Sequence, residues 1–367
     1  MPKQLWMTLG LCVGGALSAQ TTATVPPICE FLPGNAAVSM PLRWSQGFLQ
    51  VFVDDDLLPP NFVGETITGL RLRRSTLPGD VDYAALTRTL TVRGGFLPFP
   101  AAQMVGGRIA NQPANMQTLF GPAPVTVAAT TAPAAGTSVG QEFVQITFTQ
   151  PLQVVAGTLF LEFEASDGPL SIEVDNWVDA VWFPDGDDTG YLVSVGDGSC
   201  TTRAAPTELR WLDGEPLNGE DIDMQVTGVA PGGLVLAWVG IDPVAAPPGP
   251  TYTGWNGTFG PADPAMSECY MWAPFEASWF GVADPAGVFG TSFTMPSAAV
   301  GLRLGVQAGW LDLSRPVVPL SFSNGLQLVC NSAGVQNHCS SMFFPGTALS
   351  SPWGPYRGQM PVLVLDY

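Results

Sequence analysis

The stretch Thr158–Glu164, TLFLEFE, decides the fold class of this chain. Leu159, Leu161 and Phe163 stand at alternate positions and share one face of an extended chain, while Glu162 and Glu164 lie on the other face. One apolar face and one charged face are typical of a half-buried strand. The stretch therefore predicts a strand whose acidic side chains point toward solvent.

Similar alternating or short apolar runs recur along the chain, and no convincing amphipathic helix follows the N-terminal segment. The chain has 42 glycines and 35 prolines, which separate most of the runs. Many short strands with such turns indicate β-sandwiches or barrels. We predict an all-β fold of two β-sandwich, jelly-roll-like domains. Its strands are expected at 47–53, 66–74, 88–93, 143–149, 158–164, 222–226, 234–240, 301–308, 325–329 and 361–367.

The N-terminus has the pattern of a secretory signal peptide. Lys3 gives a positive start, residues 5–17 are largely apolar, and Ser18-Ala19 supplies small residues for cleavage. The apolar run is too short to span a bilayer, and no later run is long enough to be a membrane helix. We expect a secreted or cell-surface protein whose residues 1–19 are removed.

The remaining chain is long enough for two cores. Acids, glycines and Cys200 gather between residues 179 and 207 and suggest a boundary there. We predict an N-terminal β-sandwich domain over 20–195 and a second β-sandwich domain over 196–335. Residues 336–367 are expected to be a C-terminal extension that closes a sheet of either domain.

The charge balance excludes several partners. The formal net charge is −18, and loss of residues 1–19, which hold the only lysine and no acid, would make it −19. Such a surface repels phosphate backbones and anionic lipid, so we expect no nucleic-acid partner and no docking on anionic lipid. The lack of a long apolar run after the N-terminal segment predicts no membrane span. A mature chain without lysine also has no Schiff-base chemistry.

The stretch Cys330–Cys339, CNSAGVQNHC, holds the only histidine, His338. A zinc site would need more ligands at suitable spacing, and a cysteine nucleophile would need a separately oriented base. In an exported protein, a Cys330–Cys339 disulfide closing a ten-residue turn is the preferred interpretation. His338 is then a turn residue.

Several stretches in two regions of the chain carry a family resemblance. GDGSC (196–200), DIDMQVTGVAPGGLVLAWVG (221–240), ECYMW (268–272) and SFSNGLQLV (321–329) resemble an uncharacterised secreted β domain common in planctomycete-type bacterial proteins. The stretches ITGLRLRRS (67–75) and 143–164 are similar to the β domain often placed before it. The resemblance implies export, an all-β architecture, a Cys200–Cys269 disulfide and no known activity. Residues 245–268 depart from the pattern, and Cys29 is left over.

One acidic loop is the best candidate for a cation site. Asp185, Asp187 and Asp188 are closely spaced between glycines, and hard carboxylate oxygens on a flexible loop suit Ca²⁺. The loop is not an EF-hand, because Gly196 stands where the twelfth-position glutamate should be. The alternative is a solvated acidic turn.

Eleven tryptophans raise the hypothesis of a carbohydrate platform, because sugar rings stack on exposed aromatic faces. Four of them stand in loop-like contexts and are the carbohydrate-contact candidates: Trp255, Trp272, Trp279 and Trp353.

The sequence supports three functional hypotheses. We favour a secreted, non-enzymatic β-sandwich protein with a surface, adhesive or carbohydrate-binding role, whose partners are polysaccharide or cell-surface components. It requires no cofactor, with Ca²⁺ as the candidate ion. The first alternative is an extracellular polysaccharide-active hydrolase that uses two carboxylates. The second is a structural subunit of the cell envelope, a homo-oligomer joined through Cys29 or through an open strand edge at 361–367.

Overall fold

The computed structural model confirms an all-β, multi-sheet protein. It describes residues 21–39, 42–76, 81–132, 139–171, 174, 176–183, 191–196, 200, 206–214, 216, 219–242, 263–266, 269–299, 302–329, 338–346 and 352–367. In these ranges the regular elements are strands and six short 3-10 helices. No helix of the described chain is long and apolar enough to cross a membrane. Residues 1–19, the expected signal peptide, lie outside the described ranges.

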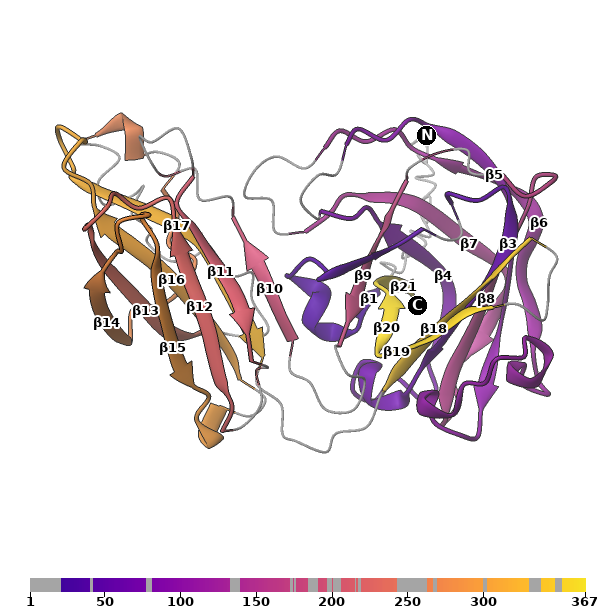
Figure 1. Cartoon of the computed structure of the whole chain (residues 1–367). Coiled ribbons are helices and arrows are strands. Elements are labelled where there is room, and N and C mark those ends of the chain that lie inside the picture. Colours follow the sequence, from indigo (N-terminus) through magenta and orange to yellow (C-terminus); the bar gives the residue numbers. More distant parts are fainter. Residues whose placement is uncertain are drawn as a thin grey trace, which may run out of the picture.

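The strands form two lobes (Figure 1). The first lobe comprises described residues from 21–183 and 338–367, and the second comprises those from 191–329. The first lobe has a four-stranded, a six-stranded and a three-stranded antiparallel sheet. The four-stranded sheet has the order β1 (Thr22–Val25), β21 (Leu363–Asp366), β4 (Thr66–Arg73), β7 (Glu142–Gln153). The six-stranded sheet has the order β19 (Trp353–Arg357), β18 (Cys339–Pro345), β3 (Gln46–Val53), β8 (Thr158–Ser166), β5 (Leu86–Leu97), β6 (Gln117–Val127). The three-stranded sheet has the order β2 (Ala36–Val38), β9 (Val178–Trp182), β20 (Gln359–Pro361).

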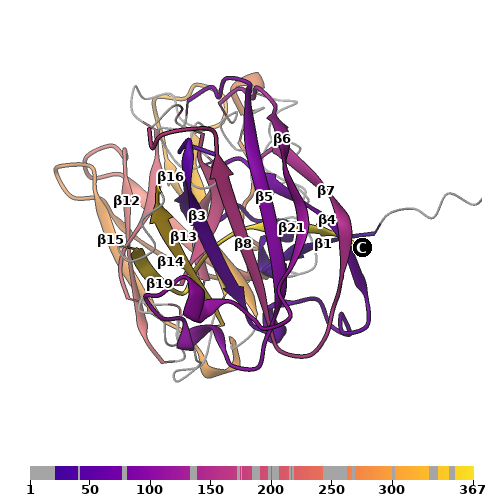
Figure 2. The same cartoon turned by 90° about the vertical axis from the view of Figure 1, so that its right-hand side faces the viewer.

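The four- and six-stranded sheets of the first lobe share one apolar core. Leu70 of β4 and Ile146 of β7 belong to the same buried cluster as Leu161 and Phe163 of β8. Two sheets joined through such a core have the architecture of a β-sandwich. Figure 2 shows β3, β8 and β5 side by side in the six-stranded sheet.

The second lobe is built in the same way. Its core joins Ile222 and Met224 of one sheet to Val235 and Val306 of the other. The five-stranded sheet has the order β10 (Tyr191–Val195), β17 (Leu320–Val329), β16 (Arg303–Leu311), β13 (Leu234–Asp242), β14 (Ala277–Val282), and the three-stranded sheet has the order β11 (Glu208–Asp213), β12 (Asp221–Thr227), β15 (Phe289–Thr294).

The last four strands return to the first lobe. β18 pairs with β3, β20 pairs with β9, and β21 lies between β1 and β4. The C-terminal residues expected to close a sheet therefore pair with N-terminal strands. In chain order the second lobe lies between two parts of the first.

The structure moves one strand across the expected boundary at residue 195. β10 pairs with β17 in the register Tyr191↔Val329 to Val195↔Gly325, so residues 191–195 extend a sheet of the second lobe. The buried side chains of Val193 and Val195 nevertheless join the apolar cluster of the first lobe. The strand β10 therefore contacts both lobes. The amino-acid composition near the expected boundary did not indicate this double role.

The strand β8 differs from its prediction on its outer face. Leu159, Leu161 and Phe163 face the core as expected, but Glu162 is fully buried and Phe160 belongs to a second apolar cluster. The connection between β5 and β6 covers this face. That connection, residues 98–116, is called the covering loop below. It contains the short helices η3 (Ala101–Gln103) and η4 (Ile109–Asn111).

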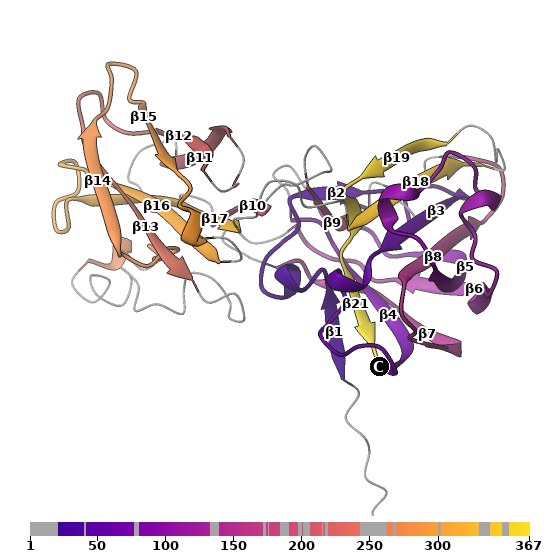
Figure 3. The ribbon, with the colours of Figure 1, turned by 90° about the horizontal axis from the view of Figure 1, so that it is seen from below.

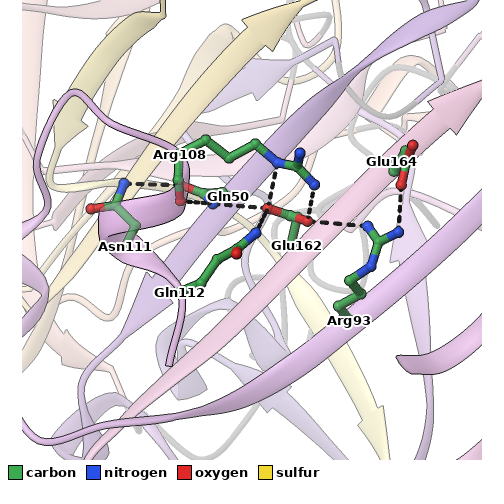
Figure 4. A network of polar contacts seen from close by, with 7 residues as sticks. All are labelled: Gln50, Arg93, Arg108, Asn111, Gln112, Glu162 and Glu164. Atoms are coloured by element: carbon green, nitrogen blue, oxygen red, sulfur yellow. Dashed lines mark hydrogen bonds and ion pairs between the residues drawn. The ribbon is translucent and has the colours of Figure 1, made fainter. Parts of the chain in front are cut away.

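Glu162 anchors the covering loop (Figure 4). The Arg108 guanidinium donates to both of its carboxylate oxygens, at 2.9 and 2.6 Å. Gln50 and Gln112 donate to Oε2 at 2.8 and 3.2 Å, and Arg93 donates to Oε1 at 3.1 Å. Burial raises the pKa of Glu162, but the hydrogen bonds from Arg108 and Gln50 outweigh burial and hold that pKa below its usual value.

An equivalent cover lies on the second lobe. The Gln307 side chain accepts from the Trp272 amide at 2.8 Å and donates to the Tyr270 carbonyl at 2.9 Å. Gln327 donates to the Trp272 carbonyl at 2.7 Å. The described residues of 263–276 thus lie against the face of the five-stranded sheet that carries Gln307 and Gln327. The amide side chains of these two glutamines form hydrogen bonds with the backbone of that segment.

We predict that Glu162→Gln destabilises the protein by about 3 kcal/mol, because removing one partner leaves buried guanidinium donors without their carboxylate. Glu164→Gln, on the same strand, is the matched control, since Glu164 pairs with Arg93 at 2.7 Å but stays partly exposed. We expect it to cost less than about 1 kcal/mol. Urea unfolding of both variants tests this, and equal losses would contradict the anchoring role of Glu162.

Candidate functional site

The described surface has a pocket in the first lobe, with a volume of about 270 Å³. Ala37 and Val38 of β2 and Ser39, which follows β2, lie on one side. The strands β18, β19 and β20 contribute Ser341, Phe343, Trp353, Tyr356 and Gln359. Figure 3 shows β2, β18 and β19 gathered on one side of the lobe. N- and C-terminal segments therefore build the pocket jointly.

The aromatic side chains of the pocket are packed in fixed orientations. Trp353 stands edge-on to Phe343 and to Trp44, with ring centroids 5.2 and 5.6 Å apart. Edge-to-face packing of this kind is favourable beyond the buried area alone. Trp353 nevertheless stays 47% exposed, and Tyr356 stays 45% exposed. The pocket therefore has open aromatic surface on a supported base.

Trp177 forms a further aromatic side of the pocket. The Arg43 guanidinium carbon lies 4.7 Å from the centroid of its ring, in the geometry of a cation–π contact. This contact orients the indole of Trp177.

Three neutral polar side chains accompany the rings. Ser39 Oγ accepts from the Trp44 indole at 3.3 Å. Ser341 is 1% exposed, and no hydrogen bond among the described residues uses its hydroxyl. Gln359 adds an amide. None of the described residues that line the pocket carries a charge.

The structure separates the four predicted carbohydrate contacts. Trp353 lines the pocket. Trp272 is only 4% exposed and packs against Gly325, so its ring has no face to offer. Trp279 is half-buried in the second lobe, donates to Thr291 and packs on Phe293. Trp255 lies outside the described residues.

Sequence reasoning missed the other aromatic residues that line the pocket, Trp177, Phe343 and Tyr356, and also Trp44, which packs on Trp353. Tyr356 stands three positions after Trp353 in SPWGPY, so it had a local signal. The other three had none, because long-range contacts between distant parts of the chain bring them to the site.

The buried acids of the first lobe are held by structural partners. Asp179 pairs with Arg73 at 2.6 Å, and burial raises the pKa of Asp179 to about 6. Asp54 accepts from the Ala101 amide and the Thr158 hydroxyl, and burial raises its pKa. Neither acid, nor Glu162, is among the described residues that line the pocket.

The predicted calcium ligands Asp185, Asp187 and Asp188 lie outside the described residues. Within the described ranges, no group of three or more His, Cys, Asp or Glu side chains is arranged to hold a metal ion.

The disulfide Cys200–Cys269 is confirmed, with the two Cα atoms 4.8 Å apart. It belongs to a buried cluster with Trp238 and Phe322 and helps to attach the segment around Cys269 to the second lobe. The Trp238 indole adds a further contact, since it donates to the Ala273 carbonyl at 3.1 Å.

The other cysteines differ from expectation. Cys339 is a thiol rather than half of the predicted Cys330–Cys339 disulfide, because β18 directs it into the core of the first lobe; Cys330 lies outside the described residues. Cys29 is buried in the same core. Burial raises the pKa of the Cys339 thiol, and smaller contributions come from the charges of Asp54 and Asp56 and last from Cys29. Buried Cys29 is thus not placed for a link between chains.

The edge expected at 361–367 is also different in the structure. β21 is paired on both sides, with β1 and with β4, so it is not open to another chain.

His338 has an acidic neighbour on the short helix η2 (Asp55–Leu57). Its Nδ1 lies 2.5 Å from the Asp56 carboxylate, and this hydrogen bond raises the pKa of His338 despite partial burial. A raised folded-state pKa means that the pair contributes stability below the ordinary value of 6.5, and that this contribution is lost as pH rises through the folded-state pKa.

We predict that the imidazole of His338 titrates above pH 6.5 in the folded protein. As the only histidine of the chain, it gives a single imidazole signal set in an NMR titration. Asp56→Asn should return the pKa toward 6.5, whereas Asp55→Asn, which removes only a longer-range charge, should change it less. A pKa unaffected by Asp56→Asn would contradict the pairing.

Comparisons with known proteins add no relative: no family model, curated protein or solved structure matches this chain. The function is therefore argued from the pocket.

Proposed function

We propose that the chain is a secreted, non-enzymatic protein that binds neutral carbohydrate in the pocket between β2 and the strands β18–β20. The observation that carries the proposal is the pairing of half-exposed Trp353 and Tyr356 with neutral hydroxyl and amide groups in one concave site.

The chemistry of a sugar ring suits this arrangement. A pyranose has apolar C–H faces and polar hydroxyl edges, so it needs aromatic surface for the faces and hydrogen-bonding groups for the edges. Aromatic surface with a few oriented polar groups is the usual composition of a small-ligand pocket. Trp353 and Tyr356 supply the surface, and Ser39, Ser341 and Gln359 supply the polar groups.

Charge favours a neutral ligand. The formal net charge of the chain is −18, so an acidic polysaccharide would be repelled at long range. The described pocket lining has no cation to compensate. A neutral sugar meets neither obstacle, and its recognition depends on stacking and hydrogen bonds alone.

Export is part of the proposal. The N-terminal signal-peptide pattern supports it, and so does the Cys200–Cys269 disulfide, because disulfides persist in oxidising compartments. A secreted binding protein meets polysaccharide outside the cell.

The two alternatives have weaker support. A hydrolase needs two carboxylates flanking the scissile bond, and the described lining of the pocket has none. The envelope-subunit alternative was based on Cys29 and on an open strand edge at 361–367. Cys29 is buried in the core of the first lobe, and β21 is paired on both sides.

We predict that Trp353→Ala weakens carbohydrate binding at least tenfold, because the variant loses the largest exposed ring of the pocket. Tenfold corresponds to about 1.4 kcal/mol of binding free energy. A glycan array on the mature protein identifies the neutral glycan, and calorimetry then measures the affinities.

Trp211→Ala is the matched control for this experiment. Trp211 is 39% exposed on β11 of the second lobe. The sheet that contains β11 includes none of the strands that line the pocket, so the loss of Trp211 should leave binding unchanged. The proposal fails when the wild-type protein binds no neutral glycan, or when Trp353→Ala and Trp211→Ala bind as tightly as wild type.

A further inference from the structure

A second exposed indole lies next to the pocket. Trp182 is the last residue of β9 and is 50% exposed. In the antiparallel pairing of β9 with β20 it stands directly opposite Gln359, which lines the pocket. Directly opposed residues of an antiparallel pair project from the same face, with Cβ atoms about 5 Å apart. Trp182 therefore flanks the pocket one strand beyond Gln359.

The backbone under Trp182 is held on both sides. Asn35 accepts from the Trp182 amide at 2.7 Å and donates to the Trp182 carbonyl at 2.8 Å. On the other side, the Phe183 amide donates to the Gly358 carbonyl at 2.9 Å. The indole thus stands on a fixed strand end. A large ring kept exposed on a fixed backbone is suited to contact a ligand with little loss of conformational entropy.

We propose that Trp182 is a second sugar subsite, so that the ligand is a linear stretch of neutral polysaccharide rather than a single sugar. The inference rests on the proposed function. One ring stacks at Trp353 and Tyr356, the chain passes over Gln359, and a following ring stacks on Trp182. Neighbouring strands are about 4.8 Å apart, so Trp182 lies about one strand spacing beyond Gln359, where a later unit of an extended chain that has passed over Gln359 would reach it.

The geometry also selects the linkage class. Units joined through equatorial β-1,4 bonds form an extended ribbon whose flat C–H faces stay accessible, so successive units can stack on separate rings. A strongly coiled chain, such as a β-1,3-glucan, would turn its next unit away from Trp182. We therefore assign β-1,4-linked glucans and mannans as the ligand class.

The test compares affinity with chain length. Calorimetry is carried out with β-1,4-gluco- and β-1,4-manno-oligosaccharides of one to six units, on wild type, Trp182→Ala, Trp182→Phe, Trp353→Ala and Trp211→Ala. Wild type should bind at least one series, with an affinity that rises about tenfold from the shortest bound oligosaccharide to longer ones. Trp182→Ala should lose that rise but keep the affinity for the shortest, and Trp182→Phe, which keeps a ring, should retain most of the rise.

The outcomes separate the two proposals. A rise with length that persists in Trp182→Ala, or no rise in wild type, overturns the second subsite while carbohydrate binding stands. Trp353→Ala should weaken binding of every length, and its failure to do so overturns the pocket itself. Absence of binding to both series overturns the ligand class assigned here, whereas a neutral glycan of another class found on the array would keep the proposed function. Circular dichroism of each variant confirms that it is folded.

Discussion

The buried carboxylate of Glu162 is the constraint on which much of the first lobe depends. A charge without solvent is costly unless it is fully hydrogen-bonded, and Glu162 meets this condition through Arg108, Arg93, Gln50 and Gln112. Arg108 and Gln112 belong to the covering loop, so satisfying the charge requires the loop to lie on the sheet. The loop in turn excludes water from β8. In the second lobe, Gln307 and Gln327 hold a covering segment by the same logic with neutral amides.

The pocket depends on the return of the chain to the first lobe. Ser341, Phe343, Trp353, Tyr356 and Gln359 all follow the second lobe in sequence, whereas Ser39 and Trp44 precede it. The site therefore exists only when both ends of the chain have paired. The sandwich beneath it, with β18 against β3, provides a base on which the aromatic rings are held before any ligand arrives. Pre-orientation of this kind reduces the entropy lost on binding.

The chemistry of the site agrees with the chemistry of the whole chain. The protein is acidic, nearly free of lysine and histidine, and rich in tryptophan. The buried carboxylates of the first lobe that pair with arginine, Asp179 with Arg73 and Glu162 with Arg108, serve packing. What the described pocket offers a ligand is aromatic surface, hydroxyl and amide, which suits recognition of a neutral molecule without covalent chemistry.

Local alternation was enough to predict the all-β class, because it decides which side chains of a strand share a face: Leu159, Leu161 and Phe163 face the core as their spacing predicts. The Cys200–Cys269 disulfide was predicted through a resemblance, and Trp353, which lines the pocket, was singled out from its loop-like context. What covers the other side of each strand depends on contacts that are visible in the folded chain alone. Alternation places Glu162 opposite the core but cannot say that a loop covers it, nor that Trp44, Trp177 and Trp182 gather around Trp353 and Gln359. The physical reason is that these contacts come from strand pairings between residues far apart in the chain, and local periodicity does not specify the partner or register of such pairings.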